Sequence, residues 1–127
     1  MNRSVFVFES NLAGRHGKGA ALFAAKEYGA ERGVGEGMTG HAYAIPTKDM
    51  NLRTRSEDEV WKSIRKFLLF ASTDGCGMWF NLTPIGCRLA GMHASDVMDI
   101  IKSEGLPWNV LLSPRWITDH NIMGEGK

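Results

Sequence analysis

The sequence is poor in cysteine and has no long apolar run. Its two cysteines, Cys76 and Cys87, give neither the spacing of a metal site nor a disulfide framework. We therefore expect reduced thiols in a cytosolic protein, and we expect no metal and no cofactor. The apolar run at residues 5–8 is shorter than the core of a signal peptide and far shorter than a membrane span, so we expect no membrane association.

An excess of charge of one sign is also absent. Fifteen Lys and Arg residues face 14 Asp and Glu residues, for a formal net charge of +1. General coating of nucleic acid depends on counterions released by many cations, so this balance argues against such a role but leaves room for a local positive pocket. The length of 127 residues and the 43% hydrophobic content predict one globular domain. We expect it to cover residues 1–118, with a flexible tail at 119–127.

Strand and helix patterns alternate along the chain. Short apolar runs predict strands at residues 4–8, 41–46, 78–83 and 109–113, and helical periodicity predicts helices at 17–28, 56–72 and 95–104. Ser56 and Glu59 have the spacing of a capping box, and Gly29 is a suitable C-terminal cap. The glycine-dense residues 33–40 predict a loop. This order predicts an α/β fold whose mainly parallel sheet is covered on both faces.

The most informative segment follows the first predicted strand. The strand leads into Ser10 and Asn11, a glycine-rich loop containing Gly17, Lys18 and Gly19 comes next, and an alanine-rich helix follows. Such a loop lets backbone N–H groups approach an anion, and the helix N-terminus adds about half a positive charge. The segment therefore predicts a site for a phosphorylated small molecule.

Two further polar segments are expected at the same edge of the sheet. Thr47, Lys48 and Asp49 follow the second predicted strand, and residues 83–91 follow the third. Ligands of parallel α/β sheets bind beyond the carboxyl ends of the strands. We therefore expect these segments to converge with Ser10 and Asn11 on one rim.

Four blocks of sequence carry a family resemblance: residues 10–14, 16–21, 43–49 and 85–91. Together they resemble a set of small macro-like proteins from phages and bacteria, and more loosely the macro domains, which bind ADP-ribose and related metabolites. The resemblance implies a three-layer α/β/α sandwich with a mainly parallel or mixed sheet, located in the cytosol of a bacterium or of a phage-infected host.

The same resemblance implies roles for individual residues. Asn11 matches the asparagine that contacts the distal ribose, and Gly17 and Gly19 match the loop that wraps this ribose and the phosphates. A second phosphate loop is implied at Gly86, Cys87, Arg88, Leu89, Ala90 and Gly91. Hydrolytic macro domains often carry an aspartate after the glycine run, where this chain has Lys18 and Gly19, so the match favours binding over de-ADP-ribosylation.

We expect the chain to bind ADP-ribose or a related nucleotide-diphosphate metabolite. One alternative is a slow hydrolase, a phosphoesterase or an ADP-ribosyl glycohydrolase, in which His16 or Asp49 transfers protons while Lys48 and Arg88 stabilise phosphoryl charge. Another is a phage or bacterial interaction protein without a small-molecule ligand.

Structural roles compete with these functional ones. Asn11 is also a good turn cap, and a loop histidine such as His16 often serves only to hydrogen-bond. Lys48 and Asp49 have the alternative of a solvated surface pair.

The same choice applies to three other residues. Cys87 is either a nucleophile or a small packed thiol. Arg53 and Arg55 are either linker charges or phosphate ligands.

Overall fold

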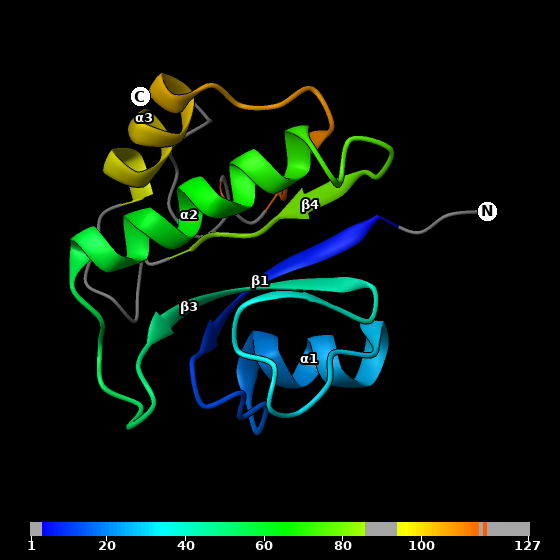
Figure 1. Ribbon diagram of the computed structural model, residues 1–127, viewed down its shortest axis with the longest axis vertical. Coiled ribbons are helices and arrows are strands. Elements are labelled where there is room, and N and C mark those ends of the chain that lie inside the picture. Colours follow the sequence, from blue (N-terminus) through cyan, green and yellow to red (C-terminus); the bar gives the residue numbers. More distant parts are fainter. Residues whose placement is uncertain (1–3, 86–93, 115, 117–127) are drawn as a thin grey trace.

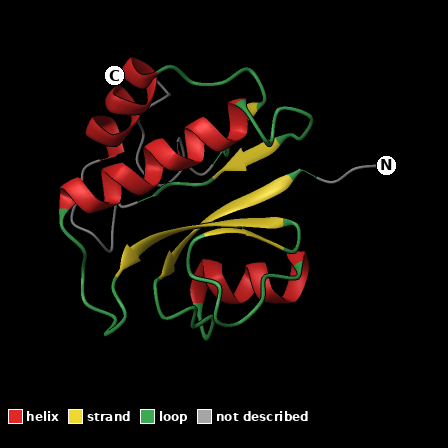
Figure 2. Ribbon diagram, viewed as in Figure 1, coloured by secondary structure: helices red, strands yellow, loops and turns green. Residues whose placement is uncertain are grey.

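The computed structural model describes residues 4–85, 94–114 and 116. It is an α/β protein with a mixed five-stranded sheet and three helices in the described residues, and this confirms the prediction of an α/β protein (Figure 1). Strands and helices alternate along most of the chain (Figure 2). The elements are β1 (Val5–Asn11), α1 (Gly19–Tyr28), β2 (Gly37–Thr39), β3 (Ala42–Lys48), α2 (Glu57–Ser72), β4 (Phe80–Leu82), α3 (Ala94–Glu104) and β5 (Val110–Leu112).

The sheet has the strand order β2-β3-β1-β4-β5. Strands β3, β1, β4 and β5 are parallel to one another, as the alternating pattern predicts, whereas β2 is antiparallel to β3. The prediction of a loop over residues 33–40 is therefore wrong at residues 37–39. Gly37 pairs with Ala44 and Thr39 pairs with Ala42, so β2 and β3 form a hairpin around residues 40 and 41, and backbone pairing with the next strand outweighs the turn preference of the glycines.

The two faces of the sheet pack against different helices. Phe6 and Phe8 of β1 pack with Ala21 and Ala24 of α1. The alternate residues of β1 belong to the larger core that contains the apolar stripe of α2 and part of α3. Figure 1 accordingly shows α1 on one side of the central strands and α2 and α3 on the other. The small alanine side chains let α1 lie close to the sheet, and Ala24 is fully buried.

The ends of the first two helices follow local sequence signals. Ser56 Oγ accepts a hydrogen bond from the Glu59 N–H at 3.2 Å, and Glu59 Oε1 accepts one from the Ser56 N–H at 3.4 Å, which confirms the capping box. Gly29 ends α1 in the left-handed conformation, at φ 74°. Helix α1 starts at Gly19 rather than at residue 17, because Lys18 is extended at φ −161°.

Strands β1 and β3 form a switch point at their carboxyl ends. They are parallel neighbours, yet β1 leads to α1 on one face and β3 leads to α2 on the opposite face. Open α/β sheets bind ligands where the connections of adjacent strands diverge in this way. The fold therefore identifies the edge to examine for a site.

Some predictions fall outside the described residues. These are the flexible tail at 119–127 and the second phosphate loop at 86–91. None of the three described helices combines the length and apolar character needed to cross a bilayer.

Candidate functional site

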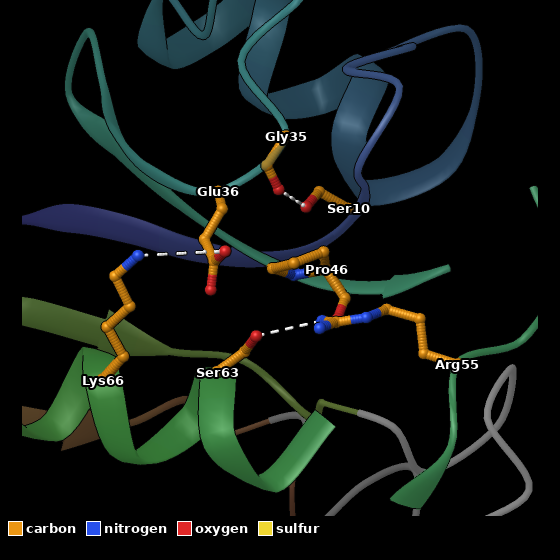
Figure 3. Close-up of polar contacts among 7 residues, drawn as sticks. All are labelled: Ser10, Gly35, Glu36, Pro46, Arg55, Ser63 and Lys66. Carbon is orange, nitrogen blue, oxygen red and sulfur yellow. Dashed lines mark hydrogen bonds and ion pairs between the residues drawn. The ribbon is translucent and has the colours of Figure 1, made fainter. Parts of the chain in front are cut away.

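The carboxyl end of β1 is tied to the segment that precedes β2. Ser10 Oγ donates a hydrogen bond to the carbonyl oxygen of Gly35 (Figure 3), and only 5% of Ser10 is exposed. A Cβ atom at Gly35 would lie 2.2 Å from the carbonyl oxygen of Asn11, so only glycine fits there. Ser10, a predicted ligand contact, therefore uses its hydroxyl hydrogen within the protein and keeps oxygen lone pairs as acceptors.

Asn11 braces the loop that follows β1. Its Oδ1 accepts from the Arg15 N–H and its Nδ2 donates to the Arg15 carbonyl oxygen, both at 2.9 Å. The turn-capping role considered for Asn11 is therefore present. A ribose hydroxyl that binds Asn11 has to share or replace one of these two hydrogen bonds.

His16 is buried beneath the same loop, with 3% of its surface exposed. Nε2 lies 2.9 Å from the Glu31 carbonyl oxygen, and because a carbonyl only accepts, this nitrogen carries the hydrogen. Nδ1 is then an acceptor, and it makes no hydrogen bond to the described residues. The ring packs edge-on to Phe8 at a centroid distance of 5.7 Å. These contacts give His16 a structural role, and proton transfer by it requires a substrate that reaches the buried Nδ1.

The loop residues Gly17, Lys18 and Gly19 are exposed and lead directly into α1. Lys18, at the N-cap position, makes no side-chain capping hydrogen bond, and the first turn of α1 contains no acidic residue. Cβ atoms added to Gly17 or Gly19 would meet nothing within 4 Å. The N-terminus of α1 thus combines unfilled space with backbone N–H groups that no side chain caps.

The N-terminus of α2 has the opposite character. Ser56 caps it, and three acidic residues occupy its first turn: Glu57, Asp58 and Glu59. These groups already satisfy and neutralise the positive end of the helix dipole. An anion therefore has a better electrostatic environment at α1 than at α2.

The carboxyl end of β3 contains an irregularity at Thr47. Ser10 lies opposite Pro46 and Asn11 lies opposite Lys48, so Thr47 has no partner residue in β1. Thr47 is 1% exposed, and its Oγ1 makes no hydrogen bond to the described residues. Irregularities of this kind re-aim side chains and are frequent beside functional sites.

Lys48 and Asp49 take part in the turn after β3. Lys48 Nζ donates to Thr54 Oγ1 at 3.3 Å. Asp49 Oδ1 accepts from the N–H groups of Asn51 and Arg53, at 2.8 and 2.9 Å.

The pKa of Asp49 is lowered mainly by the hydrogen bond from the Arg53 N–H. The bond from Asn51 and the charges of Arg53 and Arg55 act in the same direction, against a raising effect of desolvation. A carboxylate stabilised in its ionised form is a weaker proton acceptor, so the turn reduces the fitness of Asp49 as a general base.

Arg55 links β3 to α2. Its Nη1 donates to the Pro46 carbonyl oxygen at 2.7 Å and to Ser63 Oγ at 2.9 Å (Figure 3). Its backbone N–H donates to the Thr47 carbonyl oxygen at 2.9 Å. From the sequence, Arg55 is either a linker charge or a phosphate ligand. Its hydrogen bond to Ser63 could not be predicted, because the packing of α2 on the sheet brings Ser63 near.

Glu36 and Lys66 approach each other on the side of the sheet that α2 covers, with 3.9 Å between Oε1 and Nζ (Figure 3).

Burial raises the pKa of the nearby Tyr43 to about 12, and the charge of Glu36 adds to this effect. Tyr43 is 2% exposed, so it is a neutral core residue at physiological pH.

The structure brings four predicted site residues together: Ser10, Asn11, Thr47 and Lys48, through the pairing of β1 with β3. Three further predicted contacts, Gly17, Lys18 and Gly19, lie at the N-terminus of α1. The others lie outside the described residues: Gly86, Cys87, Arg88, Leu89, Ala90 and Gly91. Within the described part of the chain, no group of three or more His, Cys, Asp or Glu side chains is arranged to hold a metal ion.

Comparison of this chain with protein-family models, with curated proteins and with solved structures gives no match. The residues at the carboxyl edge of β1 and β3 are therefore the basis for assigning a function.

Proposed function

We propose that the protein binds ADP-ribose or a related nucleotide-diphosphate metabolite at the carboxyl edge of β1 and β3. The observation that carries the proposal is the N-terminus of α1, which has no side-chain cap, no acidic residue in its first turn and open space at Gly17 and Gly19. Backbone N–H groups that bind a charged oxygen contribute about 1.5–3 kcal/mol each. In this proposal the diphosphate lies over these groups.

The proposal extends to the fold family, to a second ligand loop and to the location of the protein. It includes a macro-like, three-layer α/β/α arrangement, a second phosphate loop at residues 86–91 and a cytosolic location, where nucleotide metabolites are abundant. The position of the α1 N-terminus beside the switch point of β1 and β3 supports it, because nucleotides bind at such places in open α/β sheets.

Binding without turnover is favoured over hydrolysis. The two candidates for proton transfer, His16 and Asp49, are committed to the carbonyl of Glu31 and to the turn at residues 49–53. Prolonged incubation with ADP-ribose, followed by chromatography, tests this part. We expect unchanged ligand, and product that disappears in both His16→Ala and Asp49→Ala would support the hydrolase instead.

Calorimetric titration with ADP-ribose, NAD and cyclic ADP-ribose tests the binding proposal. The Gly17→Val variant should lose binding, because its side chain occupies the space above the α1 N-terminus. Gly77→Val is the matched control, since a Cβ at Gly77 also meets nothing within 4 Å and Gly77 lies in a different turn. The absence of heat with every ligand for the wild-type protein would contradict the proposal.

A further inference from the structure

The guanidinium of Arg55 is hydrogen-bonded through Nη1, whereas its Nε and Nη2 make no hydrogen bond to the described residues. Nη1 gives its two hydrogens to Pro46 and Ser63 (Figure 3). Among the residues that the structure describes, Nε and Nη2 make no hydrogen bond and no carboxylate lies within 4.0 Å of the group. The edge formed by Nε and Nη2 matches two oxygens of a phosphate group, and the anchoring of Nη1 holds that edge in place.

Thr47 supplies a second unmet hydrogen bond at the same corner. Its backbone carbonyl accepts the N–H of Arg55 at 2.9 Å, and its buried Oγ1 has no partner among the described residues. A buried hydroxyl without a partner is unfavourable by about 1–3 kcal/mol. An oxyanion bound to Arg55 removes this deficit if it also reaches Oγ1, which is buried in the ligand-free protein.

The carboxylates near Arg55 already have partners of their own. Asp49 accepts two backbone N–H groups of its turn, and Glu36 lies 3.9 Å from Lys66. Glu59 accepts the N–H of Ser56 in the capping box. The positive charge of Arg55 is therefore not neutralised by a direct ion pair in the described structure.

We propose that Arg55 and Thr47 form an oxyanion site that takes a phosphate group at the carboxyl end of β3. The site is separate from the N-terminus of α1, because α1 and α2 lie on opposite faces of the sheet. It holds whether or not the ligand proposed above is correct. A purely structural role for Arg55 accounts for its bonds to Pro46 and Ser63, but not for the unpaired hydroxyl of Thr47.

Calorimetric titration with inorganic phosphate, against sodium chloride at equal ionic strength, tests this site. All proteins carry Gly17→Val, which blocks the α1 N-terminus, so that failure here is distinguishable from failure of the nucleotide proposal. In this background Arg55→Lys should weaken phosphate binding by at least about tenfold, because lysine cannot provide the two-pronged contact. Arg32→Lys, a change at an exposed arginine before β2, should leave the affinity unchanged.

Thr47→Val distinguishes a role of the Thr47 hydroxyl in phosphate binding from a role in stabilising the fold. The substitution keeps the shape of the side chain and removes a hydroxyl that has no partner in the ligand-free protein. We expect weaker phosphate binding together with an unfolding midpoint that is unchanged or higher without phosphate. Three results would overturn the proposal: no binding in the Gly17→Val background, equal binding by Arg55→Lys, or a lower unfolding midpoint for ligand-free Thr47→Val.

Discussion

Gly33 donates its backbone N–H to the carbonyl oxygen of Gly14 at 2.9 Å, and the two residues touch backbone to backbone. A Cβ atom at Gly14 would lie 2.4 Å from the Cα of Gly33. This contact fastens the loop after β1 to the segment before β2, next to the bond between Ser10 and Gly35. The predicted ligand loop is thus held by contacts that span distant parts of the sequence.

Gly14→Ala should destabilise the protein by at least about 2 kcal/mol, because the new methyl group collides with backbone and the residue has a φ of 70°. Urea unfolding gives the free energy of unfolding. Gly33→Ala is the control: Gly33 also has a positive φ, at 91°, but a Cβ there meets nothing within 4 Å. Equal destabilisation by both changes would show that the close contact does not matter.

Protonation of Asp49 should destabilise the fold in acid. Its pKa in the folded protein lies below the ordinary value of 3.8, mainly through the hydrogen bond from the Arg53 N–H. The stabilisation is therefore present above pH 3.8 and is lost as the pH falls through the folded-state pKa.

Unfolding by urea at neutral and at acid pH measures this effect. Asp49→Asn keeps an oxygen acceptor but cannot titrate, so its free energy of unfolding should fall less between the two pH values than that of the wild type. Asp74→Asn, at an exposed position after α2, is the control and should follow the wild type. An acid sensitivity of Asp49→Asn equal to that of the wild type would contradict the prediction.

Ionisation of Tyr43 should destabilise the fold in alkali. Burial raises its pKa from 10.0 to about 12, with a further contribution from the charge of Glu36. The folded state therefore holds the proton more tightly than the unfolded state. The stabilisation is complete below pH 10.0 and is lost as the pH rises through about 12.

Ultraviolet absorbance of the phenolate follows this titration. The chain has two tyrosines, so Tyr43→Phe leaves only the signal of Tyr28. We expect the late step near pH 12 to disappear in this variant and stability in alkali to rise relative to the wild type. A wild-type curve without a step near pH 12 would be the contrary result.

The sequence predicted those parts of the fold whose signals are local. The capping residues Ser56 and Glu59 lie within one helical turn, and Gly29 acts on the helix immediately before it. The prediction failed at β2, which pairs with β3 across a turn of only two residues, because the glycine content of residues 33–40 favours a loop and hides the strand. Alternation of strands and helices was sufficient for the sheet, since parallel strands require crossover helices.

For the candidate site, the sequence predicted the edge but not the bonds within it. Ser10, Asn11, Thr47 and Lys48 meet because both strands end at the same edge. The burial of His16 and the anchoring of Arg55 depend on Glu31 and Ser63, which only the folded chain brings near. No local pattern in the sequence marks such partners.

The most direct test is calorimetric titration of the wild-type protein and its Gly17→Val variant with ADP-ribose. We predict saturable heat for the wild type, much weaker binding for Gly17→Val, and equal thermal unfolding midpoints for the two proteins without ligand. Wild-type protein that is folded and gives no heat, or a Gly17→Val variant that binds as tightly as the wild type, would contradict an anion site at the N-terminus of α1.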